Sequence, residues 1–256
     1  VESVKEMEDQ LKQTFHLKEV FVSPNLVDDE EINLRDTCRA LAGNLDKYII
    51  DNTVVAVSWG NTLNCLAGQI QPLKAKDIKV VQLNGGVAKS ASSTGASQIV
   101  DALTMAGHGI GYMFPVPAIV DSKHTSEILQ EETQVKNVLR LAKEAEVSIF
   151  SIGALSKDSI LYEVEYLKDE DFQALEKNKA VGDIASRYFD INGNIALKEL
   201  DDRVVGFGLE ELREKEWTIA IAVGVNKVDA IIGALRAGFM NVLYTDEKTA
   251  REILNR

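Results

Sequence analysis

The sequence predicts an α/β protein with a Rossmann-like, mostly parallel sheet that carries helices on both faces. Four apolar runs rich in Val, Ile and Ala are long enough for strands that are buried on both sides, as parallel strands are. Small polar residues and a helical spacing follow each run. With 45% hydrophobic residues in 256, one domain spanning residues 1–256 has ample core. The four runs are Thr53–Thr62, Ile78–Gly86, Val147–Leu155 and Thr218–Ile231.

The amino-terminal half predicts helices that alternate with strands. Residues 4–15 place their apolar side chains on one helical face, and residues 20–22 read as a short strand that ends at a Ser-Pro-Asn sequence. Helical spacing returns over residues 29–50. After the first long strand we expect a helix that starts past Gly60 and stops near Pro72, ahead of the strand at 78–83.

The carboxyl-terminal half continues the alternation. Residues 94–105 and 126–145 each have helical spacing, and the glycines at 107, 109 and 111 between them imitate a dinucleotide fingerprint. Those glycines precede a strand instead of following one, so they predict a helix cap and turn. Residues 112–117 resemble a strand, and their two prolines favour an edge strand or a loop over the site.

The end of the chain adds a turn and a closing unit. Residues 190–194 predict a hairpin turn at Asn-Gly, because a calcium loop would need a glutamate that does not follow. Residues 241–244 and 245–254 predict a final strand and helix.

Composition restricts the function. The net charge of −12 argues against this chain gripping a nucleic-acid backbone by itself. The longest apolar run, Thr218–Val225, is too short to cross a bilayer, and the amino end lacks a secretory signal, so we expect a cytoplasmic protein. Cys38 and Cys65 predict free buried thiols. The start at Val1 suggests a fragment or a processed chain that lacks an amino-terminal module.

Two glycine loops are candidate phosphate sites. The sequence Ser-Trp-Gly-Asn-Thr at 58–62 combines a strand end, a glycine, polar donors and a helix N-terminus, which favours anions. The alternative is a tight turn in which Ser58 or Asn61 caps the helix. Gly224 to Lys227 repeats the geometry and adds a cation at the end of a helix that favours anions.

Two further segments have roles that the sequence alone does not decide. Asn84, Gly85 and Gly86 end the second buried strand, with the glycines most simply serving the turn. Asp183 predicts either a helix cap or an acceptor for ligand hydroxyls.

Reactive groups are not evident. His16, His108 and His124 lack the paired spacing of a metal site, and neither a nucleophile elbow nor a P-loop pattern occurs. We therefore expect a binding protein without a catalytic residue, cofactor or metal.

Five motifs together resemble the effector-binding domain of the SorC family of bacterial sugar-responsive transcriptional regulators. They are SWGNT, QLNGG, AVGDIASRYFDINGN, VGVNKVDAI and LYTDEKTA, and the similarity runs in order over essentially the whole chain. The resemblance implies a fold related to glucosamine-6-phosphate deaminase and ribose-5-phosphate isomerase, which binds a phosphorylated sugar without the enzymes' chemistry. It also implies a homo-oligomer, dimer or tetramer, that binds operator DNA through an amino-terminal helix-turn-helix module absent here.

The loops and the resemblance together predict the site. The phosphate residues are Gly60, Asn61, Thr62, Asn226 and Lys227, and the sugar residues are Asn84, Gly85, Gly86 and Asp183. Some family members have arginine at the position of Asn84, and the deoxyribose-phosphate regulator has a lysine that forms a Schiff base. Asparagine carries no charge and forms no imine, so we expect a noncovalent monophosphate ligand. Lys89 is the nearest amine in the same loop.

Two other functions compete with the sensor. A sugar-phosphate isomerase or deaminase of the same fold would need Asp183 or Asp121 as a base. A purely structural oligomerisation module would explain neither the lysine nor the glycine loops.

Overall fold

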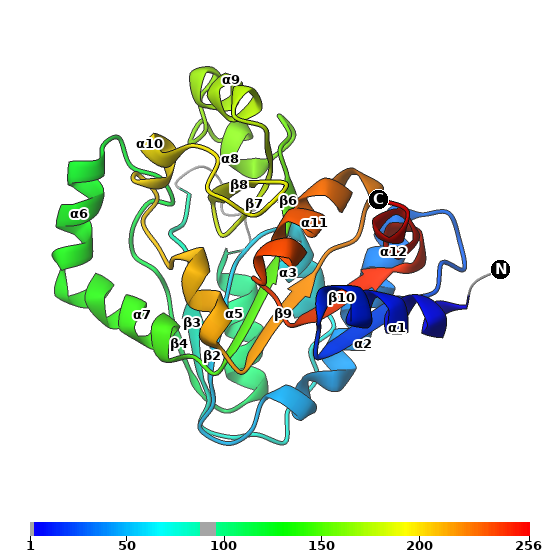
Figure 1. Cartoon of the computed structure of the whole chain (residues 1–256). Helices are drawn as coiled ribbons and strands as arrows, with labels where there is room; N and C mark the ends of the chain where they lie inside the picture. The colour runs from blue at the N-terminus through cyan, green and yellow to red at the C-terminus, as the bar shows by residue number, and fades with distance from the viewer. Residues whose placement is uncertain (1–2, 88–95) are drawn as a thin grey trace.

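The computed structural model describes residues 3–87 and 96–256, and a parallel sheet runs through the middle of this part (Figure 1). Its seven strands lie in the order β1-β10-β9-β5-β2-β3-β4, and every neighbouring pair is parallel. The strands are β1 (Glu19–Ser23), β2 (Val54–Val57), β3 (Lys79–Gln82), β4 (Ile110–Tyr112), β5 (Val147–Ser151), β9 (Trp217–Ile221) and β10 (Val242–Asp246). The predicted Rossmann-like α/β class is confirmed.

Helices cover both faces of this sheet. One face packs against α1 (Val4–Phe15), α7 (Thr133–Glu144), α11 (Val228–Ala237) and α12 (Glu247–Leu254). The other packs against α2 (Glu30–Tyr48), α3 (Asn61–Ala67) and α5 (Ala96–Ala106). Ala56 belongs to the first core, whereas its neighbours Val55 and Val57 belong to the second, as the two-residue period of a strand requires. Burial on both faces explains why the central strands read as continuous apolar runs.

A second, antiparallel sheet stands beside the first. It is formed by β6 (Gly153–Ala154), β7 (Ala180–Ile184) and β8 (Arg187–Asp190), in that order. Short helices surround it, namely α8 (Ile160–Glu163), α9 (Asp169–Lys177) and α10 (Lys198–Asp201). In Figure 1 this unit occupies the top of the molecule. Because β5 leads into β6 across one residue, the unit begins at the carboxyl end of a central strand.

The remaining elements join these layers. Helix α6 (Lys123–Glu131) precedes α7, and two short 3-10 helices, η1 (Leu209–Glu214) and η2 (Val225–Lys227), flank β9. None of the helices described is long and apolar enough to cross a membrane.

Several predicted boundaries are wrong. The run at 147–155 is two strands, because the chain leaves the main sheet after Ser151. The helix expected at 126–145 is broken at Glu132, whose ψ of 136° is extended. The helix after Gly60 ends at Ala67, well before Pro72. Only the start of 112–117 belongs to a strand, and β4 is an edge strand with the prolines beyond it.

The turn predicted at Asn192 and Gly193 is confirmed. Gly193 has φ 78°, and Asp190 Oδ1 accepts hydrogen bonds from the backbone N–H groups of Asn192 and Asn194 at 2.9 and 3.0 Å. The hairpin between β7 and β8 was not foreseen. It turns at Ala185 and Ser186, whose φ values of 50° and 70° are those of a tight hairpin turn.

Candidate functional site

A hollow of about 300 Å³ lies where the central strands of the main sheet meet the small sheet. It collects segments that follow β2, β5 and β9, together with the β7–β8 hairpin. Ligands of parallel sheets bind at the carboxyl ends of the strands, and the hollow occupies that place. The predicted residues that line it are Gly60, Asn61, Thr62, Asn84, Asp183, Asn226 and Lys227.

The two glycine loops form one side of the hollow. Gly60 has φ 139° and Gly224 has φ 133°, which are backbone conformations that side chains rarely allow. Gly60 is the N-cap of α3 and offers no side chain, so the interpretation of Ser58 or Asn61 as the cap is wrong. The first N–H groups of α3 therefore have no capping side chain and are open to an acceptor. Because α3 has only seven residues, these N–H groups matter more than its dipole.

Lys227 supplies the cation of this wall. The side chain is partly buried, and loss of hydration lowers its pKa, while the carboxylates of Glu30 and Asp183 act in the opposite direction. Among residues 3–87 and 96–256, no salt bridge neutralises this ammonium group. A dehydrated cation without a contacting carboxylate is well placed to receive an anion.

Asp183 and Asn84 also line the hollow. Asp183 lies in β7, so it is not a helix cap, and its Oδ2 accepts a hydrogen bond from Ser186 N at 3.1 Å. Burial raises the pKa of this carboxyl to about 6, and the hydrogen bond and Lys227 offset only part of the effect. Asn84 is 3% exposed and donates from Nδ2 to Ser186 Oγ at 3.1 Å. Its Oδ1 is buried without a partner in the described part of the chain.

Gly85 and Gly86 do not line the hollow. A Cβ at Gly85 would lie 2.5 Å from the carbonyl oxygen of Val116, and Gly85 O accepts a hydrogen bond from Trp59 Nε1 at 2.8 Å. Gly86 forms an isolated bridge with Pro117. Gly85 therefore allows the backbone behind Asn84 to pack closely, whereas a Cβ at Gly86 would meet nothing within 4 Å. Lys89 lies outside the described residues.

Sequence reasoning missed several residues of the wall. They are Ser151, Ser156, Asp158, Ser159, Ser186 and Tyr188. Ser151 ends β5 and follows the same strand-end rule as Ser58, so it was open to prediction. Ser186 and Tyr188 belong to the β7–β8 hairpin, and the other three residues lie between β6 and α8, for which the local sequence gave no signal. Asp121 is exposed and does not line the hollow.

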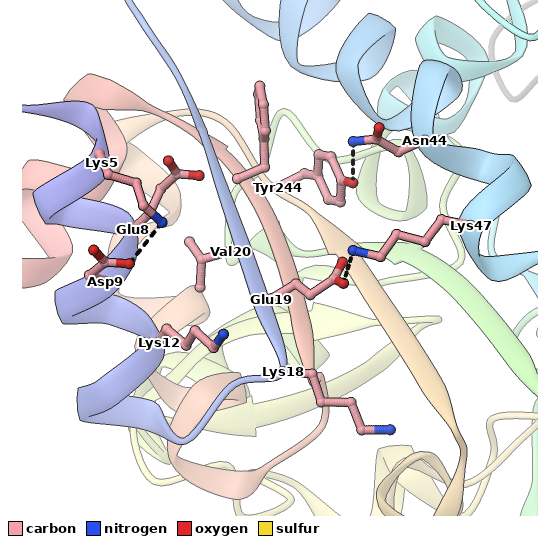
Figure 2. A pocket seen from close by; sticks show the side chains of 11 residues that line it. Lys5, Glu8, Asp9, Lys12, Lys18, Glu19, Val20, Asn44, Lys47 and Tyr244 are labelled. Carbon is pink, nitrogen blue, oxygen red and sulfur yellow. Dashed lines mark hydrogen bonds and ion pairs between the residues drawn. The ribbon is translucent and has the colours of Figure 1, made fainter.

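A second hollow, of about 340 Å³, lies between α1, β1 and α2 (Figure 2). Its charged residues are Lys5, Glu8, Asp9, Lys12, Lys18, Glu19 and Lys47. Several of the cations already have partners: Lys5 pairs with Asp9 at 2.9 Å, and Lys47 pairs with Glu19. These exposed pairs and the absence of a glycine turn among the lining residues make it a weaker anion site than the first hollow.

Comparisons with known proteins show the family of this chain. A family model described as "Putative sugar-binding domain" matches residues 1–255. The chain belongs to this family, as a sugar-binding domain of SorC-type transcriptional regulators. It is 33% identical over 220 residues to the deoxyribonucleoside regulator of Bacillus subtilis (strain 168), covering 86% of this chain and 70% of the relative.

Solved structures of the family share the fold. A DeoR family transcriptional regulator from Listeria monocytogenes superposes with a TM-score of 0.90 at 27% identity, covering 98% of this chain and 100% of that chain. The full-length sorbitol operon regulator SorC from Klebsiella pneumoniae has a TM-score of 0.90 at 23% identity, with 98% and 81% coverage, and shows the fold alone. The resemblance seen in the five motifs is thereby confirmed.

Proposed function

We propose that this sugar-binding domain is the sensor of a transcriptional regulator and binds a phosphorylated sugar noncovalently. The observation that carries the proposal is Lys227, a partly buried cation without a salt bridge beside two glycine turns. A phosphate between the turns would accept hydrogen bonds from the backbone of Gly60 to Thr62 and from the ammonium group. Asn226 is exposed beside Lys227 and adds an amide donor.

The sugar part of the ligand would lie toward Asp183 and Asn84. Asp183 accepts hydrogen bonds from hydroxyl groups, and the unpartnered Oδ1 of Asn84 needs a donor of the same kind. A hollow of about 300 Å³ suits a molecule of the size of a pentose or hexose monophosphate. Asn84 has no amine and forms no imine with the ligand, which supports noncovalent binding.

The regulatory role extends beyond this chain. The B. subtilis relative is named a deoxyribonucleoside regulator, and this chain covers 70% of its length. With a net charge of −12, the domain is unsuited to hold DNA itself. We propose that a separate amino-terminal module binds the operator, that this domain assembles the regulator into oligomers in the cytoplasm, and that the effector changes operator affinity.

A thermal-shift panel tests the ligand. The purified chain is heated with pentose and hexose monophosphates, with the matching free sugars and with inorganic phosphate. A phosphate ester at ~100 times its dissociation constant should add about 2.7 kcal/mol of stability, whereas the free sugar should add much less. A shift with a free sugar and none with any phosphate would contradict the proposal.

One observation favours an enzyme as the second candidate. Asp183 has a pKa raised to about 6 inside the hollow, which is where a general base works well. If the chain were a sugar-phosphate isomerase or deaminase, it would convert a sugar phosphate that stabilises it, and Asp183→Asn would abolish the turnover. Product analysis by NMR after long incubation separates an enzyme from a sensor, which leaves the ligand intact.

A further inference from the structure

The two cysteines of the chain come together next to the site. Cys38 lies in α2 and Cys65 lies in α3, and both belong to the core between these helices. The two thiols share a hydrogen bond, and Cys38 Sγ also contacts the carbonyl oxygen of Thr62 at 3.8 Å. Cys38 has no exposed surface, whereas Cys65 is only half-buried. Cys65 is therefore the more accessible residue of the pair, and Cys38 is its buried neighbour.

We propose that Cys65 is an oxidation site for hydroperoxides and that Cys38 resolves the oxidised sulfur into a disulfide between α2 and α3. The arrangement has the two parts that such a site needs, an accessible attacking thiol and a neighbouring resolving thiol. Cys65 lies one helical turn after Thr62, which belongs to the proposed phosphate loop of residues 60–62.

The electrostatics assign the same roles. The hydrogen bond from Cys38 lowers the pKa of Cys65 to about 7, and the guanidinium group of Arg35 adds to the effect, while burial and Glu31 oppose it. For Cys38, the same hydrogen bond and burial raise the pKa, although Lys227 pulls it down. At neutral pH the thiolate is thus on Cys65, the residue that solvent reaches.

The chemistry balances with a hydroperoxide as the oxidant. The Cys65 thiolate attacks the distal oxygen of the O–O bond, an S–O bond forms, and the other oxygen leaves and takes a proton. Cys38 sulfur then attacks the sulfenic sulfur, an S–S bond forms, and hydroxide leaves as water with the Cys38 proton. Two thiols and one molecule of hydrogen peroxide give one disulfide and two waters.

Disulfide formation also removes a contact of the phosphate loop. The Cys38 thiol loses its hydrogen where its sulfur contacts the carbonyl oxygen of Thr62 at 3.8 Å, and a covalent link then joins α2 to α3. We expect the first turn of α3 to change its backbone stability when the disulfide forms.

Mass spectrometry on the full chain tests the site. The reduced protein is treated with equimolar hydrogen peroxide, alkylated and mapped. We expect loss of two hydrogens, protection of both cysteines, and recovery with dithiothreitol. In Cys38→Ser, oxidation should stop at a sulfenic acid on Cys65 that dimedone traps, whereas Cys65→Ser should resist the same dose. Native protein that keeps both thiols free, while the urea-unfolded chain forms the disulfide, would overturn the proposal.

Alkylation rates provide a readout that disulfide geometry does not affect. Iodoacetamide should modify Cys65 at least about tenfold faster than Cys38, with a midpoint near pH 7 that rises in Cys38→Ala because the stabilising hydrogen bond is lost. Faster labelling of Cys38 would contradict the assignment. Amide hydrogen exchange over residues 60–66 should differ between the reduced and oxidised chains, and identical exchange would exclude an effect on the phosphate loop.

Discussion

Asp183 and Lys227 are two charged residues that share one hollow without a salt bridge between them. Each lies where burial disfavours its charged form, so both pKa values are displaced toward neutrality. A group of this kind costs folding stability unless a partner arrives. The ligand that we propose would supply one, with a phosphate at Lys227 and hydroxyl groups at Asp183.

Removal of the Lys227 side chain should weaken ligand binding but have little effect on the stability of the fold. A charge-assisted hydrogen bond is worth roughly 1.5 to 3 kcal/mol, so Lys227→Ala should lower phosphate-ester affinity about tenfold to a hundredfold in calorimetry. Thermal stability should stay level or rise, because a desolvated charge is removed. Lys12→Ala removes the same charge from the second hollow and serves as the control. Equal affinity of Lys227→Ala and wild type would mean that the lysine is only a surface residue.

Asp183 should make stability depend on pH. Its folded pKa of about 6 lies above the ordinary 3.8, so between these values the folded chain holds a proton that the unfolded chain has released. The contribution of Asp183 to the free energy of unfolding is therefore fully present below about pH 4 and is lost as the pH rises through 6. The loss is at most about 3 kcal/mol, and it is smaller if water enters the hollow.

The variant Asp183→Asn should remove this pH dependence of folding stability. We expect urea unfolding to show higher stability than wild type at pH 7, similar stability at pH 4, and weaker sugar binding at pH 7. Asp121→Asn, an exposed carboxylate outside the hollow, should change neither quantity. Parallel pH profiles of wild type and Asp183→Asn would show that the carboxyl is not perturbed.

At the scale of elements, three segments build the site. The glycine turns after β2 and β9 direct backbone groups into the hollow, and the β7–β8 hairpin brings Asp183 and Ser186 to face them. Arg187 fastens this hairpin to the loop behind Asn84, since Nε donates to Phe207 O at 2.9 Å and Nη2 to Gly206 O at 3.1 Å. Asn84 forms an isolated bridge with Gly206, so the loop at Gly206 connects the hairpin to the end of β3.

Gly60 and Gly43 form a matched pair for testing the first turn. An added Cβ meets nothing within 4 Å at either glycine, but Gly60 has φ 139° and Gly43 lies within α2 with ordinary helical backbone. Gly60→Ala should cost about 1 to 3 kcal/mol in strain and weaken phosphate-ester binding. Gly43→Ala should instead stabilise the chain by roughly 0.5 to 1 kcal/mol. Urea unfolding and calorimetry measure both, and equal effects would contradict the role of the turn.

At the scale of the molecule, net charge separates sensing from DNA binding. The excess of 12 negative charges repels phosphate backbones, so the isolated chain should show no sequence-specific DNA binding. Because we propose that this domain assembles the regulator, the same chain should self-associate in sedimentation experiments. A regulator that carries this domain and a helix-turn-helix module should bind its operator with an affinity that the effector alters near its own dissociation constant. An operator affinity that stays the same with every sugar phosphate that stabilises the domain would favour the enzyme hypothesis.

Local sequence was sufficient for most of the main sheet and for the glycine turns at Gly60 and Gly224. Strands buried on both faces need continuous apolar runs, and turns with a φ near 139° need glycine, so both leave direct signals. The Asn-Gly turn at 192–193 was predictable for the same reason. Helix ends were predicted less well. Gly68 follows Ala67 as the C-cap of α3 and is a local signal that the prediction missed, whereas no glycine or proline marks the break at Glu132.

Sequence alone determined the fold class and the family, and it named the residues that we propose hold an anion. Only the tertiary structure decided which of them meet. The hollow brings Asp183, Ser186 and Tyr188 together with Lys227, and it leaves out Gly85 and Gly86. Helix packing alone joins Cys38 to Cys65. These contacts connect residues far apart in the chain, and local propensity carries no information about which distant surfaces will pack together.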